Sequence, residues 1–202
     1  MTTAEGPFEA GRVETAARDR VRTWIGVALS LFLLNLAAYV GFTLVGGIFF
    51  VISDALALLL GVAMVPVVSG LPQALSGPKP STVATRVGLA GAGLVGVGAL
   101  ILLASEVAHE LVPGAGGLGL QFIGFSLIGV WLMAVGRSGR SNDGVSRIGA
   151  NAALVAGVAF AVGILAVPLG PASPVVALAA AFSFGGFVTW SVVSRRDLAT
   201  SQ

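Results

Sequence analysis

The chain has no cysteine, and its 202 residues include only one histidine, one tyrosine and one lysine. Without cysteine there is no disulfide framework, no thiolate metal site, no covalently attached c-type haem and no thiol nucleophile. A single histidine cannot provide two axial ligands to a haem. The sequence also lacks G-x-S-x-G, H-E-x-x-H and glycine-rich nucleotide motifs. We therefore expect a non-enzymatic protein with no cofactor and no metal centre.

Charged side chains are scarce as well. They make up 10% of the sequence, whereas a soluble domain has roughly 25%. Hydrophobic residues make up 56%, and the mean hydropathy is +0.98. A soluble fold of this length could not keep so much apolar surface out of water. The sequence therefore predicts an integral membrane protein in contact with lipid, and the net charge of only +2, spread over short clusters, argues against a nucleic-acid partner.

Six stretches are apolar over the roughly 20 residues that a helix needs to cross a bilayer. The predicted fold class is all-α: a polytopic membrane protein with six transmembrane helices arranged as three hairpins. The predicted spans are residues 24–45, 48–70, 87–105, 118–136, 148–169 and 175–194. Residues 106–117 contain Pro113 and several glycines and are predicted to form a loop.

The basic residues test this count independently. If the segments between spans alternate between inside and outside, all of the basic residues fall on one side: Arg12, Arg18, Arg20, Arg22, Lys79, Arg86, Arg137, Arg140, Arg147, Arg195 and Arg196. Arginine and lysine near span ends are retained in the cytoplasm. We therefore expect cytoplasmic tails at residues 1–23 and 195–202 of a multi-pass protein in a cell membrane. The excess of arginine over lysine favours a GC-rich prokaryotic genome.

The segment Phe8 to Arg22 has two interpretations. Glu14 and Arg18 have the i, i+4 spacing that supports a helix, and such a helix could lie on anionic lipid. The apolar face is thin, however, which favours a partly disordered tail with arginines next to the membrane.

Asp54 is the one carboxylate inside an apolar run. A charge at that depth costs a few kcal/mol on insertion scales, so the side chain should face protein or water, or be protonated. One hypothesis is a proton- or cation-coupling site. The other is a structural residue that neighbouring hydroxyls, Asn35 or water satisfy, only about 10 Å below the outer surface by helix rise.

Glu106, His109 and Glu110 share a helix face at i, i+3 and i+4 near the end of the third span. One Glu-x-x-His cannot form a di-iron site, which needs two copies and further glutamates. A solvated polar helix end is the simplest interpretation. The alternative is a weak cation or pH-sensing site, which Gln121 of the fourth span could join.

Small residues recur at every fourth position in the third and fifth spans, as Gly88, Ala92 and Gly96 and as Gly149, Ala153 and Gly157. Since lipid provides no hydrophobic drive for helix association, such residues predict close helix packing. The alternatives are a homo-oligomer interface, such as a dimer, or mobile helices that slide during a transport cycle. Asn35 and Asn151 are expected to form hydrogen bonds between helices.

Taken together, these features favour a structural, stress-related or accessory membrane component. The alternative is a small proton- or cation-coupled transporter or channel that uses Asp54, with Glu106 and Glu110 at its entrance. The sequence identifies neither a small-molecule nor an ion substrate.

Overall fold

The computed structural model describes residues 7–45, 48–75, 77–108, 115–141, 145–163 and 174–200. Within these ranges the chain forms six helices and no strand. The helices are α1 (Pro7–Val45), α2 (Ile48–Ala74), α3 (Thr82–Ala108), α4 (Ala115–Arg140), α5 (Arg147–Gly163) and α7 (Pro174–Thr200). The predicted all-α class is confirmed.

Five of these helices are long and apolar enough to cross a membrane. The exception is α5, whose 17 described residues span about 26 Å, slightly less than the hydrocarbon thickness. The predicted fifth span continues to residue 169, beyond the described part of α5. The five long helices are consistent with a multi-pass membrane protein.

The first helix extends far beyond its apolar part. α1 has 39 residues and begins at Pro7. The segment Phe8 to Arg22, which the sequence allowed to be either a partly disordered tail or a helix, is therefore helical and continuous with the apolar part of α1. Proline is favourable at this position because an N–H group in the first turn of a helix has no acceptor within the helix, so its absence costs no hydrogen bond. Arg18 donates from Nε to the carbonyl oxygen of Ala74 at 3.3 Å, which joins this extension to the last turn of α2.

Two helices also extend into the loop predicted at residues 106–117. α3 continues to Ala108, and α4 already begins at Ala115. One glycine of this segment lies within α4 and packs against α3: a Cβ on Gly117 would lie 2.8 Å from the carbonyl oxygen of Gly98. Glycine is more frequent in membrane helices than in soluble ones for this reason.

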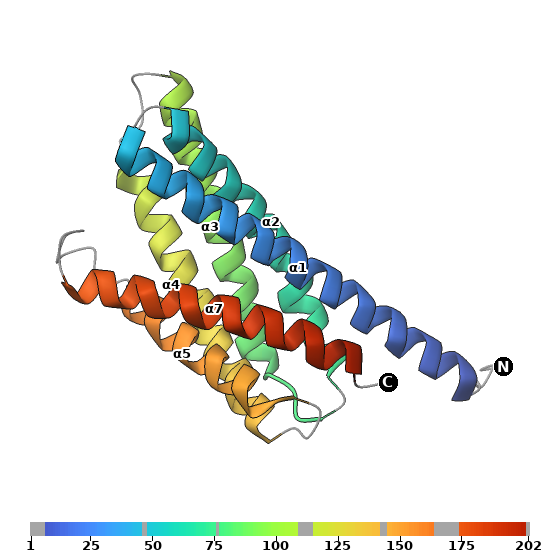
Figure 1. Ribbon diagram of the computed structural model, residues 1–202. Coiled ribbons are helices and arrows are strands. Elements are labelled where there is room, and N and C mark those ends of the chain that lie inside the picture. The colour runs from blue at the N-terminus through green and yellow to red at the C-terminus, as the bar shows by residue number, and fades with distance from the viewer. Residues whose placement is uncertain are drawn as a thin grey trace.

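Each helix packs against the one before it, and α7 returns to pack against α1. Figure 1 shows the result, with α1 and α7 on the near side of the bundle and α3 and α4 behind them. The two helices contact each other at Phe32, whose ring centroid lies 4.6 Å from that of Phe187, and at Gly26, where a Cβ would lie 3.1 Å from Arg195 Cζ. Beyond this contact the two helices diverge, so that the end of α1 and the start of α7 lie far apart in Figure 1.

Aromatic and aliphatic side chains fill the interior of the bundle. Trp131 of α4 and Trp190 of α7 are both buried, with ring centroids 5.8 Å apart in an edge-on arrangement. Phe187 lies between Trp190 and Phe32 and connects the two tryptophans to the aromatic cluster around α1. Among the described residues, the only buried charged side chain is Asp54.

The two ends of the bundle differ in charge. We call the end that contains the last turns of α2, α4 and α7 and the first turns of α3 and α5 the basic end, and the other the opposite end. At the basic end Arg140 donates from Nε and Nη2 to Asn151 Oδ1, at 3.0 and 2.7 Å, which joins α4 to α5. No arginine or lysine occurs in residues 23–78, 87–136 or 148–194, so the opposite end has none.

The outer surface is apolar on every helix. Large hydrophobic side chains are exposed along the whole bundle, for example Leu34, Leu59, Leu100, Val158 and Phe182. A soluble monomer rarely exposes apolar patches on this scale. This belt supports a bundle that is embedded in a membrane.

Candidate functional site

Asp54 lies in the second turn of α2 and is 5% exposed. It is the first residue of the buried face of this helix, which continues through Ala57 and Gly61 at helical spacing. The carboxylate therefore faces other helices rather than lipid. By helix rise it lies about 9 Å along the axis from Ile48, so it is close to the opposite end of the bundle.

The two oxygens of this carboxylate have different surroundings. Gln121 of α4 donates from Nε2 to Asp54 Oδ1 at 3.4 Å, which is long for a hydrogen bond. Asp54 Oδ2 is buried and has no hydrogen-bond partner among the residues that the structure describes. A buried oxygen without a partner is costly, since it has lost its water and gained nothing in return. The site therefore holds an unused hydrogen-bond acceptor.

Glu106 of α3 adds a second negative charge near Asp54. Its side chain is exposed, and it is close enough to repel the Asp54 carboxylate. His109 and Glu110, the other two members of the predicted cluster, lie outside the described residues. Within the described part of the chain, no group of three histidine, cysteine, aspartate or glutamate side chains is arranged to hold a metal ion.

Asn35 does not bind Asp54, although the sequence made it a candidate partner. Its Nδ2 donates instead to the backbone oxygen of Ser53 at 2.6 Å and to Ser53 Oγ at 3.3 Å. This bond joins α1 to α2 one residue before Asp54. Asn35 therefore holds the backbone next to the carboxylate and leaves Oδ2 unpartnered.

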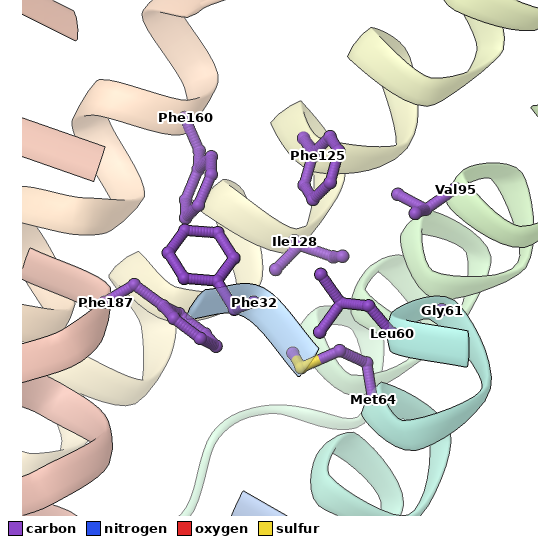
Figure 2. A pocket seen from close by; sticks show the side chains of 9 residues that line it. All are labelled: Phe32, Leu60, Gly61, Met64, Val95, Phe125, Ile128, Phe160 and Phe187. Carbon is purple, nitrogen blue, oxygen red and sulfur yellow. The ribbon is translucent and has the colours of Figure 1, made fainter. Parts of the chain in front are cut away.

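A narrow apolar groove lies inside the bundle, further from the opposite end than Asp54. Its internal space is about 10 Å³, close to the minimum for one water molecule. Figure 2 shows Phe32 from α1 reaching into this region between Phe160 and Phe187. The groove is partly open to the outside and has only apolar residues in its lining, which comprises Phe32, Leu60, Gly61, Met64, Val95, Phe125, Ile128, Phe160 and Phe187.

The predicted small-residue face of α3 lies against α2 and α4. A Cβ on Gly88 would be 2.7 Å from Trp131 Cγ. Ala92 and Gly96 face Gly61 of α2, where a Cβ would be 2.9 Å from both the Ala92 carbonyl oxygen and the Gly96 nitrogen. These residues therefore contact helices of the same chain.

The corresponding face of α5 is divided between two neighbours. A Cβ on Gly149 would lie 3.0 Å from Val193 of α7, and one on Gly157 would lie 2.6 Å from the carbonyl oxygen of Gly129 on α4. Ala153 is fully buried. Gly149 and Gly157 point to different helices because eight residues of α-helix do not complete a whole number of turns.

Sequence reasoning missed other close contacts of this kind. Gly91 and Gly124 face each other, with a Cβ on either lying 2.7 Å from the carbonyl oxygen of the other. Gly129 of α4 faces Gly157 in the same way, at 2.6 Å in both directions. The partner glycines on α4 lie five residues apart, outside the four-residue pattern, because one contacts α3 and the other α5.

Comparison with protein-family models, with curated proteins and with solved structures gives no match.

Proposed function

We propose that this chain is a six-span protein of a cell membrane, with both termini in the cytoplasm, that acts as a non-enzymatic structural, stress-related or accessory component. On this proposal it provides no route for ions across the bilayer. The distribution of the basic residues supports the orientation, since all of them occur at one end of the bundle or in its extensions. The sixth crossing requires α5 to continue beyond Gly163, as the apolar sequence up to residue 169 suggests.

The main support for a non-conducting role is the apolar interior. An ion that entered at Asp54 would next meet Phe32, Phe160 and Phe187, and then the tryptophan pair. Moving a charge through such surroundings without polar partners is very unfavourable. In the described part of the chain the buried polar side chains besides Asp54 are four serines, Ser126, Ser183, Ser191 and Ser194.

A second candidate function is proton- or cation-coupled transport, and one observation favours it. The unpartnered Oδ2 of Asp54 could accept a proton or a cation that enters from the opposite end. Transport would then require the aromatic residues around Phe32 to move apart in a second conformation of the bundle.

Flux measurements in proteoliposomes distinguish these two functions. We expect proton, sodium and potassium fluxes through the wild type to equal those of protein-free vesicles and those of Asp54→Asn. This substitution removes the charge and keeps the size of the side chain. A wild-type flux that Asp54→Asn abolishes would instead establish the transport function.

The orientation has its own test. Protease added outside sealed cells should leave tags at both ends of the chain intact, and it should cut both tags in inverted vesicles. Cleavage of only one tag under either condition would mean an odd number of crossings and would refute the proposed topology.

The small-residue faces do not support a homo-oligomer, because they contact other helices of the same chain. If the protein forms homo-oligomers, it must use its outward-facing surfaces. The lipid bilayer is the partner that the exposed apolar belt supports.

A further inference from the structure

We propose that Arg22 of α1 and Arg195 of α7 form a binding site for the phosphate group of an anionic phospholipid at the basic end of the bundle. The acyl chains of this lipid would lie on the exposed apolar surfaces of the same two helices. The site rests on the proposed membrane location, and it adds the class of lipid that the chain recognises.

The first argument is the position of Arg195 against α1. A Cβ on Gly26 would lie 3.1 Å from Arg195 Cζ and 3.3 Å from both its Nε and its Nη1. The guanidinium group of α7 therefore lies on the bare backbone of α1. Arg22 precedes Gly26 by four residues, so it lies on the same face of α1, about 6 Å along the axis. Two arginine side chains at this separation can reach one phosphate group.

The second argument is that neither arginine has a strong partner. Arg195 is exposed, and no carboxylate pairs with it in the described part of the chain. Asp197, the acidic residue next to it on α7, accepts a hydrogen bond from the Ser146 N–H at 2.8 Å. Arg22 Nη1 lies 3.9 Å from Asp19 Oδ1, but both side chains are exposed, and such an ion pair contributes little. Both guanidinium groups can therefore form paired hydrogen bonds with phosphate oxygens.

The third argument is the charge of the surrounding segments. Residues 18–22 of α1 and 195–197 of α7 contain five arginines and two aspartates. Each arginine close to a membrane surface adds to the attraction of lipids with a net negative charge. A zwitterionic phospholipid offers the same phosphate group, but its ammonium group is repelled by the excess of arginine. The site therefore favours a lipid whose phosphate has no cation beside it.

The fourth argument is the order of polar and apolar groups along the two helices, which lie on the same side of the bundle in Figure 1. Trp24 follows Arg22 by two residues, and tryptophan is enriched at the depth of the lipid head groups. Deeper in the membrane Val27 is exposed on α1, and Val192, three residues before Arg195, is exposed on α7. The acyl chains need no internal cavity, because this surface already faces lipid.

The test compares phosphatidylglycerol with phosphatidylcholine of identical acyl chains, so that only the head group differs. Native mass spectrometry of the full-length protein in detergent micelles measures the affinity of the first lipid that binds. We expect phosphatidylglycerol to bind the wild type about 10-fold more tightly, because two arginines contribute to its attraction. Equal affinity for the two lipids would show that the apolar surface alone binds them and would overturn the proposal.

Variants locate the head group. Arg195→Gln and Arg22→Gln should each weaken phosphatidylglycerol binding about fivefold and leave phosphatidylcholine unchanged. Both side chains are exposed, so neither substitution leaves a cavity in the core. Arg86→Gln is the matched control, because it removes an exposed arginine at the same end from α3, which packs against α2 and α4. It should change the affinity by less than about twofold. Equal losses in the three variants would show diffuse attraction to the basic end and would refute the site.

Inorganic phosphate distinguishes a lipid from a free anion. Added at the concentration of the lipid, it should not displace phosphatidylglycerol, because the acyl chains also contribute to binding. Displacement would show that phosphate alone fills the site and would overturn the assignment to a lipid. The proposed function has separate outcomes: ion flux, or cleavage of only one tag, would refute it without changing the lipid affinities. Equal binding of the two lipids would refute this site and leave the proposed function intact.

Discussion

Gly91→Ala is expected to destabilise the bundle by about 1–3 kcal/mol, the usual cost of overpacking a tight contact. The new methyl group would lie 2.7 Å from the carbonyl oxygen of Gly124 and 2.9 Å from the backbone nitrogen of Ile128. Both atoms belong to the backbone of α4, so no side-chain rotation can relieve the clash. α3 and α4 would have to separate. The free energy of unfolding in mixed micelles measures this effect.

Gly93→Ala is the matched control for this substitution. Gly93 lies two residues along the same helix, and a Cβ there meets no atom within 4 Å. The same chemical change should therefore alter the unfolding free energy by less than about 1 kcal/mol, within the range of helix propensity. Equal losses for the two variants would show that the close approach of α3 and α4 does not govern stability.

Trp131→Ala should have the largest effect of any single substitution discussed, a loss of about 3–5 kcal/mol. Trp131 is fully buried between α3 and α7, against Gly88 and Trp190. Truncation would leave a cavity in the centre of the bundle, which its neighbours cannot fill without moving helices. Thermal unfolding followed by circular dichroism is the appropriate measurement.

Trp131→Phe distinguishes the volume of this side chain from its polar group. The indole Nε1 is buried and has no hydrogen-bond partner among the described residues. Phenylalanine removes this unpaired donor, a gain of about 1–3 kcal/mol, and loses part of the packing, at a cost of similar size. We expect a net change within about 1 kcal/mol. A loss as large as that of Trp131→Ala would mean that the indole N–H is essential to the core.

The boundaries of the helices show where sequence reasoning is weakest. Each predicted span overlaps one of the six helices, and five of these helices are long and apolar enough to cross a membrane. Hydropathy did not predict the 17 residues of α1 ahead of residue 24 or the helical turns at Ala108 and Ala115. Hydropathy reports the part of a helix that faces lipid. It does not report where backbone hydrogen bonding stops, which depends on contacts such as that between Arg18 and Ala74.

The candidate site was only partly predictable. Asp54 was evident as a lone carboxylate in an apolar run, whereas its neighbours depend on how three helices rotate about their axes. The sequence made Asn35 a candidate partner of Asp54 and associated Gln121 only with the cluster around Glu106. In the structure the Asn35 amide faces Ser53, and Gln121 contacts the carboxylate. Periodicity places residues on a common face and cannot say which helix that face meets.

Composition and hydropathy were sufficient to establish a helical membrane protein, because peptide groups in lipid must form their hydrogen bonds within helices. The same information placed all of the basic residues at one end of the spans. The tertiary structure was needed to show that Asp54 faces inward with an unpartnered oxygen and that aromatic side chains close the interior behind it. It was also needed to pair Gly91 with Gly124 and Gly157 with Gly129. These features depend on how each helix is rotated about its axis and shifted along its neighbours. Van der Waals contacts between residues far apart in the chain determine that rotation and that shift.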